Sequence, residues 1–300
     1  MAKVAHTLRS TRNVFAPINK LPPEILAHIC TFVPASEAKS DFAQVCTQVC
    51  RWWRNTLLAS PSLWNEILVE DPLHVGIHLV RSGEMPLEVY FYRSSPVDRF
   101  CQKIVPHLDR VRLLYLSLCQ VDCEQILGSL EANGRTMSLC DFHFEKGSPE
   151  LSLSASMMEK ISSFAANITT LVLWNVDGHL SSLTFPRLLH FYIVTKGGHK
   201  GPQVSDVIGF LRGSPVLQEL DLQCASYSCT DDATTHIEPV TLQCLKRVLL
   251  RGRPSPPSHH PLPYIEVDIL PHLYLPPAGQ CRIDIYPADV SFPRGTNYLL

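Results

Sequence analysis

Residues 21–67 of the chain are LPPEILAHICTFVPASEAKSDFAQVCTQVCRWWRNTLLASPSLWNEI, and their apolar periodicity predicts three short helices. The proline pair at the start suits a first helical turn, because the missing N–H of a proline would be unpaired there in any case. Two neighbouring apolar rows then follow at helical spacing: Ile25, Ile29 and Phe32, and beside them Leu26, Cys30 and Val33. Together they make an apolar face about twice the usual width for a surface helix. One row can fill the core of the bundle, and the other needs a partner to cover it.

The second half of this stretch has the same surplus of apolar surface. Val45, Val49 and Trp52 follow helical spacing, and Trp53 begins an adjoining row. Consecutive helical side chains point about 100° apart, so the two tryptophans cannot both enter one small core. Two interpretations are open: the bundle packs on the domain that follows it, or it docks on another protein.

The order and spacing of these residues resemble the F-box motif, in particular the form that is common in fungal proteins. The matching positions are Leu21, Pro22, Glu24, Ile25, Leu26, Ile29, Val49, Cys50, Arg51, Trp53, Ser62, Leu63 and Trp64. The sequence departs from the motif at Pro34, in the polar run 35–40 and at Trp52, where a polar residue is more typical. The resemblance implies a docking bundle that binds a Skp-type adaptor subunit and, through it, a cullin–RING ubiquitin ligase.

The resemblance also implies, position by position, which residues would form the adaptor interface. The set is Leu21, Pro22, Ile25, Leu26, Ile29, Val45, Val49 and Trp53. The first five would lie against the adaptor, and the last three would complete the interface and the core that supports it.

Composition narrows the class of protein further. The chain has 300 residues, is 45% hydrophobic and carries a formal charge of −2, which argues against a general binder of nucleic acid or anionic membranes. No apolar run approaches the roughly 18 to 20 residues that a spanning helix needs. The basic N-terminus has the character of a mitochondrial targeting segment or of a flexible tail. Most of the 11 cysteines lie in apolar periodic segments, which favours a reducing compartment, the cytoplasm or the nucleus.

A repeat follows the bundle. The spacing L-x-x-L-x-L recurs six times, with middle residues Leu114, Phe142, Leu171, Phe191, Leu220 and Val248. These residues are 28, 29, 20, 29 and 28 positions apart, and periods of about 20 to 29 with this signature are typical of leucine-rich repeats. The Asn or Cys that usually follows each repeat strand is displaced or missing here. The pattern therefore predicts an α/β fold: an F-box three-helix bundle and then an irregular leucine-rich-repeat-like solenoid with a parallel sheet. The alternative is an ordinary α/β domain whose strands are spaced alike.

The same patterns predict four regions along the chain. Residues 1–17 are a flexible N-terminal tail, 18–67 the F-box domain and 68–253 the repeat-like substrate-recognition domain. Residues 254–300 are a proline-rich loop followed by short capping strands, expected at Tyr264–Ile269 and Cys281–Ile285.

Sequence motifs for catalysis, phosphate binding or metal binding are weak in this chain. The glycines of KGGHKGP, which begins at Lys196, do not lead into a helix with a Lys-Ser or Lys-Thr pair, as a phosphate-binding loop would. The close cysteine pairs lack second pairs at zinc spacing. We therefore expect no catalytic residues, no cofactor and no metal. A basic cluster at Lys246, Arg247, Arg251 and Arg253 could meet an acidic or phosphorylated peptide, although solvated strand charges explain it more simply.

These features predict a non-catalytic substrate-recognition adaptor of a Skp–cullin–F-box type E3 ubiquitin ligase. The F-box would dock on the Skp-type adaptor, and the repeat domain would bind an unidentified target protein. The alternative is a protein-interaction scaffold outside any ligase, which uses or has lost adaptor binding. A hydrolase hidden in the repeat region has only scattered His, Asp and Ser residues in its favour.

Overall fold

The computed structural model describes residues 15–32, 39–69, 72–92, 95, 97–132, 138–145, 154–176, 180–195, 201–224, 237–252, 269–277 and 279–286. The chain forms two compact units whose boundary lies between Tyr90 and Phe91. Each unit is described by itself below.

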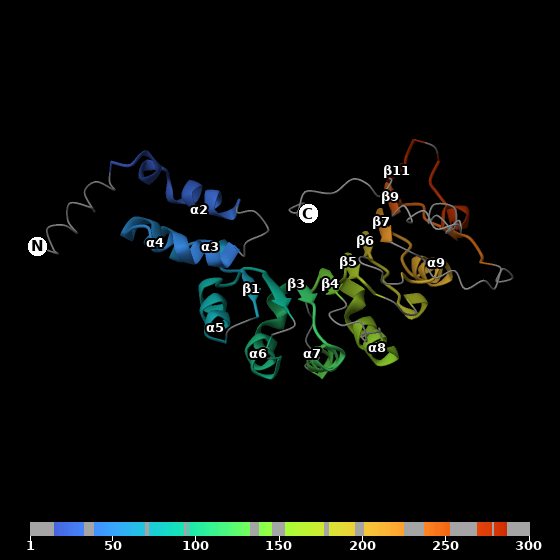
Figure 1. Cartoon of the computed structure of the whole chain (residues 1–300), viewed down its shortest axis with the longest axis horizontal. Helices are drawn as coiled ribbons and strands as arrows, with labels where there is room; N and C mark the ends of the chain where they lie inside the picture. Colours follow the sequence, from blue (N-terminus) through green and yellow to red (C-terminus); the bar gives the residue numbers. More distant parts are fainter. Residues whose placement is uncertain are drawn as a thin grey trace, which may run out of the picture. The chain divides into compact units, whose positions relative to one another are not determined.

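The first unit begins with the predicted helical bundle (Figure 1). Its elements are η1 (Pro17–Lys20), α2 (Pro23–Thr31), α3 (Lys39–Cys46), α4 (Arg51–Leu58) and η2 (Pro61–Leu63). After the bundle come β1 (Glu66–Leu68), α5 (Pro72–Arg81) and β2 (Leu87–Phe91), which ends at the boundary. Strands β1 and β2 are parallel, with Ile67 opposite Val89. Helix α2 starts as the proline pair predicts, with Pro22 at its N-cap and Pro23 as its first residue.

The bundle has a small core of its own. The buried residues are Leu26, Cys30, Ala43, Cys46, Leu57, Leu63 and Trp64. The indole Nε1 of Trp64 donates a hydrogen bond to the carbonyl of Leu57 at 2.9 Å, which satisfies the polar atom of this buried ring. The chain after α4 is thereby fixed against the helix that precedes it.

In the second unit, seven described strands form one parallel sheet, in the order β3-β4-β5-β6-β7-β9-β11. The strands are β3 (Val111–Leu116), β4 (Asp141–Glu145), β5 (Thr170–Trp174), β6 (His190–Val194), β7 (Glu219–Cys224), β9 (Arg247–Gly252) and β11 (Arg282–Tyr286). The helices are α6 (Val97–Ile104), α7 (Gln120–Ala132), α8 (Ala155–Phe164) and α9 (Val204–Arg212), and they lie along one side of the strands (Figure 1). The 3-10 turns are η3 (Val105–Arg110), η4 (Ala165–Asn167), η5 (Leu180–Ser182) and η6 (Leu270–His272). A separate parallel pair joins β8 (Val240–Thr241) to β10 (Leu273–Tyr274).

The register of this sheet follows the predicted repeat. Leu114 is opposite Phe142, and the partners continue through Leu171, Phe191, Leu220 and Val248. All six side chains are at most 2% exposed. The predicted α/β architecture with a parallel sheet is therefore confirmed. The 20-residue interval between Leu171 and Phe191 holds the short turn η5 in place of an α-helix, because the interval is too short for one.

Two strands were expected in the C-terminal region of the chain. The strand expected at Cys281–Ile285 is β11, which pairs parallel with β9 and extends the main sheet. The strand expected at Tyr264–Ile269 lies outside the described residues apart from Ile269, which precedes η6. The pairing of β9 with β11 also gives the basic cluster near β9 an acidic neighbour, because Nε of Arg247 lies 3.3 Å from a carboxylate oxygen of Asp284 on β11.

Aromatic side chains join the sheet to its helices, and they predict where the second unit is most sensitive to mutation. Phe191 is fully buried, and its ring lies 4.3 Å from that of Phe210 on α9. We expect Phe191→Ala to lower the free energy of unfolding by about 3–5 kcal/mol, because it leaves a cavity in a packed layer. Urea denaturation followed by circular dichroism measures this loss.

The matched control is the same substitution at an exposed ring. Phe32 is 72% exposed, so Phe32→Ala is expected to change the free energy of unfolding by no more than about 0.5 kcal/mol. A similar small loss at Phe191 would contradict the packing described above.

Candidate partner-binding site on the N-terminal bundle

Helix α2 separates its two apolar rows between the inside and the outside of the bundle. Leu26 and Cys30 are 0% and 1% exposed and belong to the core. Ile25 and Ile29, one turn apart in the other row, are 46% and 45% exposed, and Phe32 just after the helix is 72% exposed. One row therefore fills the core and the other faces solvent.

The second half of the bundle adds exposed apolar side chains. Val45 near the end of α3 is 62% exposed, and Val49 before α4 is 56% exposed. Trp52 and Trp53 are both half-buried and pack against the edge of the core. The indole Nε1 of Trp53 donates to Oδ1 of Asn19 at 2.7 Å, so this ring is fixed in place by the segment before α2.

The structure places the eight predicted interface residues in three groups. Pro22, Ile25, Ile29, Val45 and Val49 are exposed, and Leu21 and Trp53 are half-buried. Leu26 is fully buried, so it supports the exposed row from inside and offers no surface to a partner. The periodicity of α2 identified both rows but not which of them points inward.

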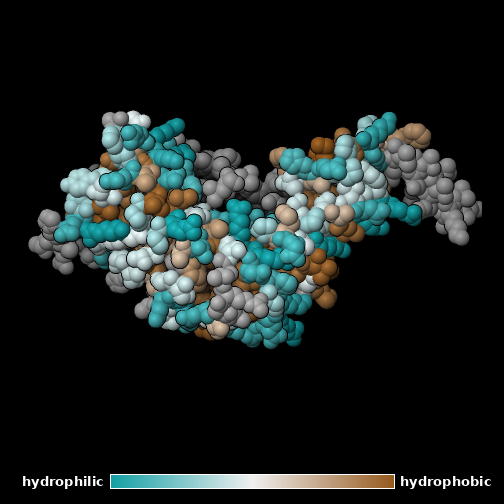
Figure 2. Space-filling view, turned by 180° about the vertical axis from the view of Figure 1, so that it is seen from behind, coloured by the Kyte–Doolittle hydropathy of each residue, from teal (hydrophilic) through white to brown (hydrophobic). Residues whose placement is uncertain are grey.

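Two exposed side chains were missed by the sequence analysis. Phe15 is 71% exposed and Ile18 is 41% exposed, and both precede the helical periodicity from which the other residues were identified. Figure 2 shows hydrophobic surface in brown on the part of the molecule that carries the bundle, at the upper right of the view.

Helix α5 repeats the two-row pattern of α2 within the same unit. Val75 and Leu79 are buried, whereas Leu73, Ile77 and Val80 are 73%, 41% and 81% exposed. The sequence analysis did not identify this exposed row, although its residues have the same spacing i, i+4, i+7 as the exposed row of α2.

The inner side of α5 is fixed by contacts to Trp64. The ring of His78 packs edge-on against Trp64 at 5.3 Å, and its Nδ1 lies 3.0 Å from the carbonyl oxygen of Glu66. The guanidinium of Arg81 lies 4.4 Å from the centre of the Trp64 ring, a favourable cation–π contact. These contacts hold the exposed row of α5 outward.

The interior of the bundle is chemically inert. Burial, together with the neighbouring Cys46 thiol, raises the pKa of Cys30 to about 12, and burial also raises the pKa of Cys46. Both thiols therefore stay protonated near neutral pH and act as small apolar groups. Nine cysteines of the described residues form no disulfide: Cys30, Cys46, Cys50, Cys101, Cys119, Cys123, Cys140, Cys244 and Cys281.

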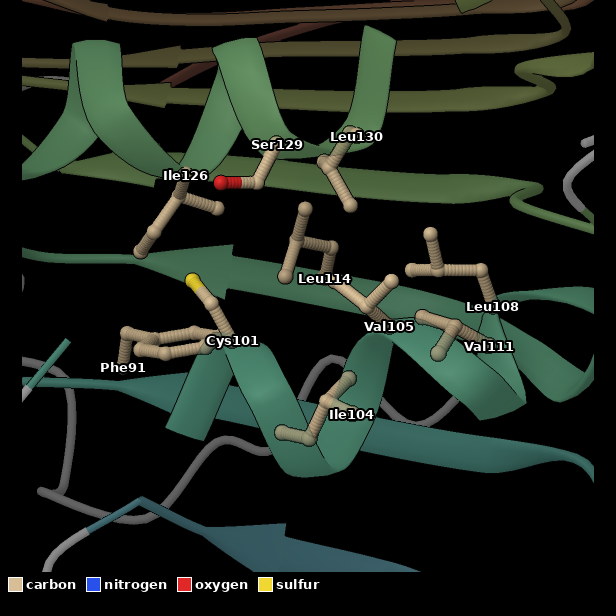
Figure 3. A pocket seen from close by; sticks show the side chains of 10 residues that line it. All are labelled: Phe91, Cys101, Ile104, Val105, Leu108, Val111, Leu114, Ile126, Ser129 and Leu130. Atoms are coloured by element: carbon tan, nitrogen blue, oxygen red, sulfur yellow. The ribbon is translucent and has the colours of Figure 1, made fainter. Parts of the chain in front are cut away.

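A small cavity lies between α6, β3 and α7 in the second unit (Figure 3). Apart from Cys101 and Ser129 its lining is apolar, and its volume is about 10 Å³, which is room for about one water molecule. It is a gap in the packing and too small for an organic ligand.

Two further kinds of feature are absent from the part of the chain that is described. No group of three or more His, Cys, Asp or Glu side chains there could hold a metal ion. No helix of the described ranges combines the length and the apolarity that crossing a membrane requires.

Comparison with protein families identifies the class of the N-terminal domain. Residues 18–70 match the model of the F-box-like family, and the described part of this range contains helices α2, α3 and α4 of the bundle and its exposed apolar row. Domains of this class generally bind a Skp-type adaptor in ubiquitin ligase complexes of the Skp–cullin–F-box type, and the proteins that carry them are generally non-catalytic adaptors. No curated protein matches the chain.

The buried thiols give the bundle a pH dependence. A thiol in the unfolded chain ionises near pH 9, whereas Cys30 in the bundle keeps its proton until about pH 12. The unfolded state therefore loses protons first, and stability falls as the pH rises above about 9, by up to about 1.4 kcal/mol per pH unit for each thiol. Thermal unfolding of the chain between pH 8 and pH 10.5 measures this slope.

The control removes both titrating groups. The double variant Cys30→Ala and Cys46→Ala is expected to be less stable at pH 8 and to lose less stability between pH 8 and pH 10.5 than the parent chain. Equal slopes in the two proteins would show that the thiols do not cause the loss.

Proposed function

We propose that this chain is a substrate-recognition subunit of a Skp–cullin–F-box type E3 ubiquitin ligase. The observation that carries the proposal is the exposed apolar row of α2, Ile25, Ile29 and Phe32, within the F-box-like domain. Covering each of these partly exposed side chains contributes on the order of 1 kcal/mol to binding. A row of this kind fits an apolar groove on a partner subunit.

Within the proposal, each interface residue has a role that follows from its exposure. Pro22, Ile25, Ile29, Val45 and Val49 contact the Skp-type adaptor directly, with Leu21 at the edge. Leu26 fills the core beneath the row, and Trp53 braces the segment before α2 through its bond to Asn19. Phe15 and Ile18 are further contact candidates.

The second unit has the complementary role in the proposal. The proposed repeat-like domain, residues 68–253, lies mainly in this unit. The parallel sheet of the unit, with middle residues in register from Leu114 to Val248, favours an irregular leucine-rich-repeat-like solenoid that binds the target protein. Residues 18–67 are the F-box domain and β11 is a capping strand. The tail at residues 1–17 and the proline-rich loop at the start of residues 254–300 lie almost entirely outside the described residues. Ubiquitin transfer takes place on other subunits, in the cytoplasm or the nucleus.

The proposed interface predicts a sharp loss of adaptor binding on mutation. Ile25→Asp together with Ile29→Asp places two carboxylates where apolar side chains meet the partner, and an unpaired buried charge costs several kcal/mol. We expect at least about a hundredfold weaker binding to a purified Skp-type adaptor by isothermal titration calorimetry. The fold remains intact because both side chains face solvent in the free chain.

The chain offers a matched control on α5. Leu73→Asp together with Val80→Asp makes the same change in another exposed apolar row of the first unit, and adaptor binding is expected to persist. If the α2 variant binds as tightly as the parent chain, the interface is elsewhere. If the chain co-purifies with the adaptor but never with a cullin, the chain is a scaffold outside the ligase.

A further inference from the structure

The sheet of the second unit has a face opposite its helices. Phe142 contacts Phe164 of α8 and Phe191 contacts Phe210 of α9, so the row that contains these two residues points toward the helices. Side chains alternate along a strand, and the next row therefore points to the other face. This row contains Tyr115, His143, Tyr192 and Asp221, which lie at the same level of the parallel register.

Two carboxylates on this opposite face accept hydrogen bonds from tyrosine hydroxyls. The hydroxyl of Tyr115 donates to Oε2 of Glu145. The hydroxyl of Tyr192 donates to Oε2 of Glu219 at 3.2 Å, and Nδ1 of His190 lies 3.2 Å from the same oxygen. Burial, together with the carboxylate of Glu145, raises the pKa of Tyr115, so its phenol stays protonated. Phenol donors orient a carboxylate without cancelling its charge.

An unsatisfied polar atom lies between these groups. Nε2 of His143 is buried and has no hydrogen-bond partner among the described residues, and burial lowers the pKa of this imidazole to about 4. A buried polar atom without a partner costs about 1–3 kcal/mol. His143 lies on β4 between Asp141 and Glu145, with its ring 6.5 Å from that of Tyr115.

Aromatic rings surround the carboxylates. Tyr92 and Tyr115 have ring centres 5.4 Å apart, and the half-buried Trp174 is the register partner of Glu145. A lysine or arginine side chain gains both from a carboxylate and from an adjacent aromatic ring. The chemistry of this face therefore suits a cationic side chain.

The basic residues at the far end of the sheet do not favour an acidic ligand. Asp284 accepts from Arg282 at 2.8 Å and lies 3.3 Å from Nε of Arg247, and these two arginines lower its pKa. Arg253 lies outside the described residues. The part of the basic cluster that is described is thus partly neutralised within the sheet itself.

We propose that the sheet face of β4 to β7 binds an extended, basic segment of the target protein, with lysine or arginine side chains on Glu145 and Glu219. The inference rests on the proposed function and names the class of target it would recruit. The two glutamates lie three strand spacings and about four residues apart in the register, which is about 20 Å on a flat sheet. An extended segment covers this span in about six residues.

A direct test uses the full chain and two labelled peptides. Both are 12 residues of Gly, Ser and Ala, one with two arginines six positions apart and the other with two glutamates in their place. Fluorescence anisotropy is expected to show binding of the arginine peptide that weakens as salt is raised, and no binding of the glutamate peptide. This comparison needs no variant, so it does not depend on the folding of a mutant.

Variants then locate the site. Glu145→Gln and Glu219→Gln keep an oxygen acceptor for the tyrosines, and each is expected to weaken binding of the arginine peptide by about fivefold or more, because each removes one charge pair. Glu159→Gln is the matched control, since this glutamate is exposed on α8. This variant is expected to bind the arginine peptide with the affinity of the parent chain. Thermal unfolding of each variant checks the fold.

The outcomes separate this inference from the proposed function. Absence of arginine-peptide binding, preference for the glutamate peptide, or unchanged affinity in both glutamine variants would each overturn the inference. Adaptor binding by the Glu145→Gln and Glu219→Gln double variant is expected to equal that of the parent chain. The Ile25→Asp and Ile29→Asp double variant is expected to lose the adaptor and keep the peptide.

Discussion

A nine-residue helix with two apolar rows sets the main constraint on the N-terminal unit. The rows start at consecutive residues, so they point about 100° apart, and a core as small as this one can bury only one of them. Leu26 and Cys30 occupy that core with Trp64 and Leu57. The position of Ile25, Ile29 and Phe32 in solvent is the direct consequence, since any rotation of α2 that buried them would expose Leu26.

Register has the corresponding role in the second unit. Each strand contributes one row to the helices and one to the opposite face, and a slip of one residue would exchange the two rows. Phe142, Leu171 and Phe191 hold the register because they fit only on the helix side, where each is at most 1% exposed. Glu145 and Glu219, which are more than 70 residues apart in the sequence, come to share a face through this register.

Features that repeat at a fixed period could be predicted from the sequence. Which row of a helix or strand points into the core and which points to solvent could not. The spacing L-x-x-L-x-L located the six strands whose middle residues run from Leu114 to Val248, because apolar residues at those positions must be buried against the helices. Periodicity alone could not show that Leu26 is the inner residue and Ile25 the outer one, nor that Leu73 and Val80 face solvent. The Arg247–Asp284 pair was also hidden, because it depends on β11 joining the sheet as a parallel strand. Tyr115, Glu145 and Glu219 occupy the variable positions of the repeat, where sequence gives no signal.

The two surfaces differ in the physics of recognition, and this difference suits a subunit with one constant partner and one selected partner. The exposed row of α2 is apolar, so contact with it depends on area and shape and changes little with salt. The face around Glu145 and Glu219 is charged and partly buried, so contact with it depends on the sign and spacing of charges and weakens as salt rises. An apolar row binds any partner groove whose shape fits it. Fixed carboxylates, in contrast, disfavour a segment of the wrong charge. The two surfaces lie in separate compact units. In the proposed function, the target-binding surface of the second unit could therefore change without altering the adaptor-binding surface of the first.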